Sequence, residues 1–148
     1  MAAWVNFLRS HSAVTRSLNT DLLQKHGLTI NDYEVLLHLA HAEERALRRV
    51  DLAERLVLTA SGITRLLDGL ERAGLVAKRR CESDARVTYA VLTDAGFEKL
   101  RDASETHLQG VRDLFERRYT EAELETLAEL LARLPLDGSE GISCSPDD

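Results

Sequence analysis

Several features that mark other classes of protein are scarce or missing in this sequence. Only two of its 148 residues are cysteines, Cys81 and Cys144, and they do not form a CxxC pair. This argues against a disulfide framework and points to a reducing compartment. No uninterrupted apolar run is long enough to cross a bilayer, and the start MAAWVNFLRSHS lacks the basic and apolar segments of a signal peptide. We therefore expect a cytoplasmic protein that makes no membrane contact.

The familiar catalytic motifs are also missing. The chain contains no GxSxG, no P-loop, no GxGxxG after a strand and no HExxH. Gly62, Gly69 and Gly74 lie within or directly after an expected helix, so they do not form a phosphate-binding loop. We expect neither enzyme activity nor a bound cofactor.

The composition favours a helix-rich globular chain with a real core. Hydrophobic residues make up 44%, charged residues 30% and aromatic residues 5% of the sequence. The net charge of −6 is unevenly spread: residues 45–101 carry 12 Lys/Arg and 8 Asp/Glu, a net of +4, which leaves −10 for the rest. Charges beyond about 8 Å are largely screened, so the basic middle can bind phosphate locally. Chance alone can produce such a distribution, so it is weak support.

Hydrophobic periodicity and capping residues predict the elements. We expect helices at 3–24, at 32–42 after a capping box at Thr29, at 49–56, at 59–74, at 94–119 and from Thr120 to Pro135. Two strand-like runs, 75–80 and 86–92, form a hairpin around 81–85, and 43–48 is a charged connection. The expected fold class is mainly α with a small β-hairpin wing, that is, an α+β winged helix-turn-helix.

The two ends of the chain carry more apolar surface than a small middle domain can cover. Aromatic and aliphatic residues recur at helical spacing in 3–24, and leucines form a seam along 124–134. Such stripes are often buried against a second copy of the chain, although both helices could instead pack within one monomer. We expect 1–28 and 94–135 to form a helical dimerisation region, 29–93 a separate lobe, and 136–148 an acidic flexible tail.

The helices at 49–56 and 59–74 have the pattern of a helix-turn-helix. Ala53 is the small residue at their contact, and apolar residues stand at the offsets that would lock the pair at a fixed angle. Val57 occupies a turn position that usually favours glycine. A positive φ would strain valine there, so we expect the turn to use another conformation.

The second of these helices has a polar face suited to DNA. At about 100° per residue, Ser61, Thr64 and Arg65 lie opposite the apolar residues. Arginine can bind guanine in the major groove, and the free N–H groups near Thr59 and Ser61 can bind phosphate. An ordinary amphipathic helix with a solvated face would explain the face, but not the helix pair with a hairpin after it.

The hairpin supplies a second candidate contact. Lys78, Arg79 and Arg80 lie on the incoming run and Arg86 on the outgoing one. An arginine near such a tip can enter the narrow minor groove. Asp84 can accept hydrogen bonds from Arg86 and hold its guanidinium in one direction.

These residues carry a resemblance to a known family. The stretches DLAERL and LTASGITRLLDGLERAGLVAKRRCESDARVTYAVLTDAG resemble the winged helix-turn-helix of MarR family bacterial transcription regulators, most strongly at Asp84-Ala85-Arg86 followed by VLTDAG. The resemblance implies a homodimer on a pseudo-palindromic double-stranded DNA operator, with Ser61, Thr64 and Arg65 at the major groove and Arg86 in the minor groove. It also implies that 29–93 is a DNA-binding lobe and that the chain represses transcription. Family members commonly respond to small aromatic or lipophilic acids, to oxidants or to metals. We expect release by a small-molecule effector, and a metal- or redox-responsive regulator of the same fold is the alternative. A helical protein-interaction module is the rival, but it leaves Arg65 and Arg86 without a role.

The sensing site is less determined. Trp4, His11, Arg16 and Tyr33 are candidates for an acid-binding pocket, although packing roles for Trp4 and Tyr33 and solvation of the others explain them better.

For a metal we expect no site. The weak candidates are Glu34, His38 and His41 on one helix face, with Glu105 and His107 on the long helix.

Cys81 lies beside two arginines, which favours a reactive thiol, and beside two acids, which oppose it. An incidental surface thiol is the favoured interpretation.

Overall fold

The structure is a computed structural model that describes residues 1–80 and 87–134. The chain divides into two compact units, Met1–Arg112 and Asp113–Asp148. Cys81, Asp84, Arg86, Cys144 and the predicted tail 136–148 lie outside the described residues, so the predictions made for them stay predictions. The predicted division into a dimerisation region and a DNA-binding lobe also stays a prediction.

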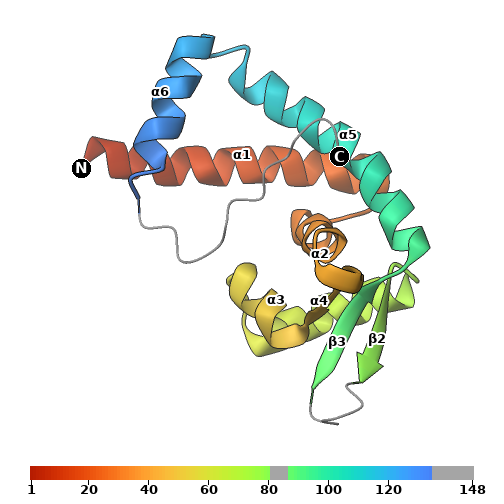
Figure 1. The fold of residues 1–148 in the computed structure, drawn as a ribbon. Coiled ribbons are helices and arrows are strands. Elements are labelled where there is room, and N and C mark those ends of the chain that lie inside the picture. The colour runs from red at the N-terminus through yellow and green to blue at the C-terminus, as the bar shows by residue number, and fades with distance from the viewer. Residues whose placement is uncertain (81–86, 135–148) are drawn as a thin grey trace. The chain divides into compact units, whose positions relative to one another are not determined.

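Helices dominate the fold, and the described strands form one small antiparallel sheet (Figure 1). The elements in chain order are α1 (Ala2–His26), α2 (Ile30–Ala40), the 3-10 turn η1 (Glu43–Arg45), β1 (Ala46–Arg48), α3 (Arg49–Arg55), α4 (Ala60–Arg72), β2 (Val76–Arg80), β3 (Thr88–Leu92), α5 (Asp94–Phe115) and α6 (Glu121–Leu131). The predicted fold class, mainly α with a hairpin wing, is confirmed.

Threonine side chains begin four of the helices, as the sequence predicts. Thr29, Thr59, Thr93 and Thr120 each accept a hydrogen bond from the backbone N–H three residues on, at 3.0 to 3.4 Å. Each therefore satisfies one of the N–H groups that has no partner within its helix. At the other end of α1, Gly27 adopts the left-handed conformation with φ 68°, which glycine takes without strain.

A third strand corrects the prediction of a charged connection at 43–48. After η1, β1 pairs antiparallel with β3, with Ala46 opposite Val91 and Arg48 opposite Tyr89, and the strand order is β1-β3-β2. Three residues are too few to show the two-residue period of a strand. The pairing comes instead from the free edge of β3, which local sequence does not reveal.

The turn between α3 and α4 corrects a second prediction. Val57 has φ 52°, so it does adopt the left-handed conformation that we expected the turn to avoid. The Leu58 N–H donates to the Ala53 carbonyl at 2.9 Å, which closes the turn in this conformation. The Val57 side chain is 91% exposed and packs against nothing that would compensate for the strain.

The core of the first unit is built around α2, whose Val35, Leu36 and Leu39 are fully buried. One face of α4 packs into this core through its buried apolar residues. The sheet packs into it through Ala90 and Leu92, which alternate along β3. The core's largest fully buried side chains are Leu22, Leu36, Leu39, Leu52, Ile63 and Val35. Burial of each such side chain contributes about 1.5–3 kcal/mol, so this packing sets the orientation of α4.

The end of the hairpin is fastened to the end of α4. Thr93 donates its backbone N–H to the Leu75 carbonyl at 3.2 Å and its hydroxyl to the Gly74 carbonyl at 2.7 Å. Gly96, in the first turn of α5, packs so closely here that a Cβ would stand 2.1 Å from the Leu75 oxygen. The hairpin therefore leaves α4 in a fixed direction.

Apolar side chains near both ends of the chain are exposed. Trp4, Phe7 and Leu8 on α1 are 58%, 41% and 44% exposed, and α6 has no buried residue. Among the described residues no helix is long and apolar enough to span a membrane.

Candidate nucleic-acid interface

Helix α4 presents an exposed polar face because the opposite face is anchored in the core. Ile63, Leu67 and Leu70 are buried, whereas Ser61 and Arg65 are exposed. The guanidinium of Arg65 has no hydrogen bond or ion pair with any residue that the structure describes. Ser61 lies 3.2 Å from the capping hydroxyl of Thr59, Oγ to Oγ1. The predicted reading face therefore has an available cation in Arg65, whereas the Ser61 hydroxyl shares a hydrogen bond with that of Thr59.

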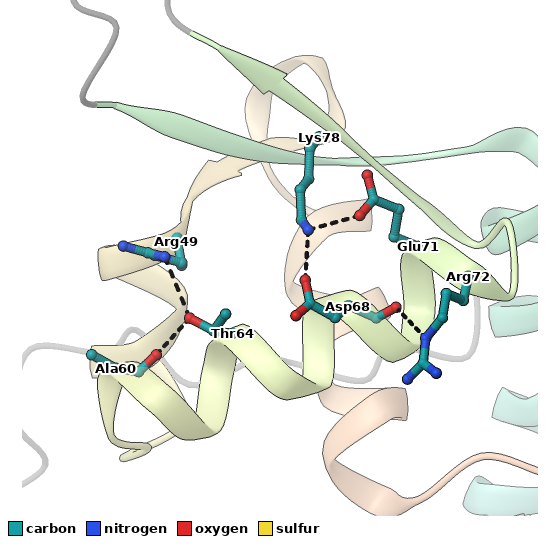
Figure 2. A network of polar contacts seen from close by, with 7 residues as sticks. All are labelled: Arg49, Ala60, Thr64, Asp68, Glu71, Arg72 and Lys78. Carbon is teal, nitrogen blue, oxygen red and sulfur yellow. Dashed lines mark hydrogen bonds and ion pairs between the residues drawn. The ribbon is translucent and has the colours of Figure 1, made fainter.

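The hydroxyl of Thr64, on the same face, makes two hydrogen bonds within the protein. Its Oγ1 donates to the Ala60 carbonyl at 2.7 Å and accepts from Arg49 Nη1 at 3.3 Å (Figure 2). The side chain is half-buried. Thr64 therefore links α4 to the start of α3, and its hydroxyl has less capacity for a base.

Arg49 is a residue that sequence reasoning missed. It lies at the start of α3, is exposed, and reaches across to α4. Its neighbour Arg48 is held instead by Asp51, through hydrogen bonds of 2.8 and 2.7 Å. The run Arg48-Arg49 was the available signal, but the sequence cannot tell which of two adjacent arginines is held by an acid.

The first wing cation, Lys78, is exposed but paired with two carboxylates of the same chain. Its Nζ lies 2.6 Å from Asp68 Oδ1 and 2.7 Å from Glu71 Oε2, both on α4 (Figure 2). These two hydrogen bonds raise the pKa of Lys78, and the bond from Lys78 lowers the pKa of Asp68. The carbonyl of Asp68 accepts a further hydrogen bond from Arg72 Nε at 3.2 Å. Sequence spacing did not show that Asp68 and Glu71 face β2.

The other two cations of β2 differ from each other. Arg79 pairs with Glu44 of η1 at 3.2 Å, and its guanidinium lies over the Tyr89 ring at 5.8 Å from the centroid. Arg80 is exposed and has no ion pair with any residue in the described ranges. A cation's position on the wing thus does not decide whether its charge is available.

A hollow of about 150 Å³ lies between part of α4 and the sheet. Both cationic and aromatic side chains line it. The lining residues are Arg49, Thr64, Leu67, Lys78, Thr88, Tyr89 and Ala90.

The residues predicted for an effector pocket lie in two environments. Trp4, His11 and Arg16 are exposed along α1, where the rings of Trp4 and Phe7 are 6.4 Å apart. Tyr33 is 2% exposed in the core. Its ring stacks on that of His107 at 4.6 Å, and its hydroxyl lies 3.3 Å from Ser104 Oγ. In this chain Tyr33 has a packing role, and the pocket stays a prediction.

The weak metal candidates do not form a cluster. Within residues 1–80 and 87–134, no group of three or more His, Cys, Asp or Glu side chains is placed to hold a metal. His41 Nδ1 lies 2.9 Å from the Leu37 carbonyl. Burial raises the pKa of Glu34, and burial together with the charges of Arg55 and His41 lowers the pKa of His38. Glu105 is exposed on α5.

His107 has an unusual environment. Its Nδ1 is buried and has no hydrogen-bond partner among the described residues. Burial lowers the pKa of this histidine, so the ring favours its neutral form.

Comparisons with known proteins agree with this geometry. The model of the MarR family matches residues 26–87, which run from the end of α1 through the helix pair and β2 and stop just before β3. The transcriptional regulator MhqR of Bacillus subtilis is 28% identical over 87% of this chain and 89% of its own length. The crystal structure of AbsC, a MarR family transcriptional regulator from Streptomyces coelicolor, superposes with a TM-score of 0.79 at 35% identity, over 88% of this chain and 87% of that one.

A further relative was crystallised with DNA. Sco3205, a MarR family regulator from Streptomyces coelicolor solved in complex with DNA, has a TM-score of 0.81 at 29% identity, over 88% of this chain and 82% of that one. The helix pair, the hairpin strands and these likenesses show that the chain belongs to the MarR family of transcriptional regulators.

Proposed function

We propose that two copies of this chain bind a pseudo-palindromic DNA operator and repress transcription from it. The observation that carries the proposal is the state of Arg65. Its guanidinium is exposed and has no ion pair in the described chain, and it lies on the face of α4 opposite the buried Ile63 and Leu67. A cation held out on a rigid helix in this way is suited to guanine in the major groove.

The proposed contacts fall into two groups. On α4, Arg65 and Ser61 meet base edges, and the N–H groups at its start meet phosphate beside Thr59. On the wing, Arg80 meets the backbone, and Arg86, oriented by Asp84, enters the minor groove. The complex of Sco3205 with DNA supports a DNA-binding role for this fold.

The proposed dimer rests on the apolar surface near both chain ends. Trp4, Phe7 and Leu8 are exposed on α1, as are Leu130 and Leu134 at the other end of the chain. A second copy would cover the exposed apolar side chains of each end, and it would hold the α4 helices of the two copies about 34–36 Å apart, one DNA turn. We further propose that a small aromatic or lipophilic acid releases the dimer from DNA, in the cytoplasm, by changing this spacing.

Fluorescence anisotropy with the DNA upstream of the chain's own gene tests the proposal. We expect Arg65→Ala to weaken binding and to relax the preference at one base position by about 1–3 kcal/mol. Arg101→Ala is the control, because Arg101 is exposed on α5 and already paired with Glu98 and Asp102. If Arg65→Ala binds as the wild type does, the proposed reading helix is wrong.

A further inference from the structure

The contacts of Lys78 assign it a role different from that of the other wing cations. We propose that Lys78 is a positioning residue that holds strand β2, and with it the wing, against α4, and that Asp68 and Glu71 are its anchors. In this role its charge does not reach the DNA backbone. The inference rests on the proposed function, because it concerns how the same DNA-binding surface is held.

The Lys78 ammonium group is held by two carboxylates, although all three side chains are exposed. It makes two short contacts, 2.6 Å to Asp68 and 2.7 Å to Glu71, from carboxylates that stand one turn apart on α4 (Figure 2). A phosphate would have to replace two charge-assisted hydrogen bonds and leave both carboxylates unpaired beside the DNA. The group of one cation and two anions also carries a net charge of −1, which repels phosphate.

The contact sits where it can set the direction of the hairpin. Lys78 is the middle residue of β2, and it pairs across the hairpin with Ala90, which is 1% exposed in the core. Its side chain therefore reaches α4 from the centre of the strand. Toward the other end of α4, Arg49 holds Thr64 at 3.3 Å. The recognition helix is thus tied to β2 through one half and to α3 through the other.

Arg80 provides an internal comparison. It lies two residues after Lys78 on the same strand, so both side chains point to the same face of the sheet. Arg80 is exposed and has no ion pair among the described residues, whereas Lys78 has two. The two cations share a face of the sheet, but only Lys78 is paired within the described chain.

The two roles for Lys78 predict opposite signs for one experiment. If simple electrostatics governs this surface, neutralising Asp68 and Glu71 removes two negative charges near DNA and tightens binding. If the carboxylates anchor the wing, neutralising them frees β2 and weakens binding. Lys78→Met also tests this, because it keeps the apolar stem and removes only the charge.

The experiment measures the affinity of the full chain for the DNA upstream of its own gene as a function of salt. We expect Lys78→Met and the pair Asp68→Asn with Glu71→Gln to weaken binding by a similar factor, about three- to tenfold, and the triple variant to be no weaker than either. The slope of log affinity against log salt should be unchanged in Lys78→Met. In Arg80→Met it should become shallower by about 0.9, as expected for one lost phosphate contact.

Tighter binding by the Asp68→Asn, Glu71→Gln variant would overturn the inference, as would a slope that is shallower by about 0.9 in Lys78→Met. Amide hydrogen exchange of the free protein separates this inference from the proposed function, because it needs no DNA. We expect faster exchange in β2 for Lys78→Met and for the carboxylate variant, but not for Arg80→Met. Unchanged exchange in both would refute the positioning role, and absence of DNA binding by the wild type would refute the proposed function alone.

Discussion

Replacing Gly96 with alanine tests how tightly the hairpin is fastened to α4. A Cβ built at this position lies 2.1 Å from the Leu75 carbonyl oxygen and 2.8 Å from Leu92 Cδ1. Leu92 could rotate its side chain, but the Leu75 oxygen belongs to the backbone and accepts the hydrogen bond from Thr93 N–H. The substitution must therefore move one backbone segment away from another.

The size of the effect follows from that displacement. The oxygen is about 1.3 Å closer than ordinary contact, which begins at 3.4 Å. Forcing extra atoms into a packed site costs about 1–3 kcal/mol, and loss of the Thr93 hydrogen bond adds about 1 kcal/mol. Alanine returns about 0.5–1 kcal/mol, because it restricts the unfolded chain more than glycine does. We expect Gly96→Ala to lower the free energy of unfolding by about 1–3.5 kcal/mol.

Urea denaturation at a fixed protein concentration measures this difference. Gly69→Ala is the matched control, because Gly69 lies within α4 and a Cβ there would have nothing within 4 Å. The same substitution should stabilise the chain by about 0.5–1 kcal/mol at this site. Equal stabilities for the two variants would show that the contact between Gly96 and Leu75 is not as close as the structure has it.

Other substitutions test the turn, the caps and the buried histidine. Val57→Gly should stabilise the chain by about 0.5–1 kcal/mol in urea denaturation, because it removes strain of about 1–2 kcal/mol at φ 52° and costs less in chain entropy; a loss of stability would contradict the positive φ. Thr29→Ala should lower stability by about 1 kcal/mol, since it removes the capping box with Asp32; no change in the thermal midpoint would refute that role. Because burial lowers the pKa of His107 below its ordinary value of 6.5, the unfolded chain binds that proton more tightly. Stability should therefore fall as pH drops through about 6.5 toward the folded pKa, and the fall should be smaller in His107→Phe. Equal falls in urea midpoint between about pH 8 and pH 5.5 would argue against this assignment.

Local chemistry made much of the fold predictable. The capping threonines at 29, 59, 93 and 120 and the glycine at 27 mark helix ends through their own side chains or backbone, so they could be read without tertiary information. The strand β1 could not, because three residues show no period and β3 supplies their partner. The preceding Arg45 is held by the Phe97 ring, 4.3 Å away and 52 positions later in the chain.

The candidate site was predictable by face but not by partner. Helical geometry placed Ser61 and Arg65 on the exposed side of α4, as observed. The sequence also groups Lys78 with Arg79 and Arg80, because cations in one run look alike in a sequence. The structure separates them, since Asp68 and Glu71 lie against β2 only after the helix and the hairpin pack together.

We expect this chain to read DNA sequence from α4 and the wing. The most direct measurement compares the affinity of the wild-type chain for the DNA upstream of its own gene with that for a scrambled duplex of equal composition, from about 50 to 200 mM salt. We expect binding to the upstream DNA to be tighter by about a thousandfold or more, with affinities for both duplexes falling steeply as salt rises. Equal affinity for the two duplexes, or no binding at the lowest salt, would contradict sequence-specific DNA binding by α4 and the wing.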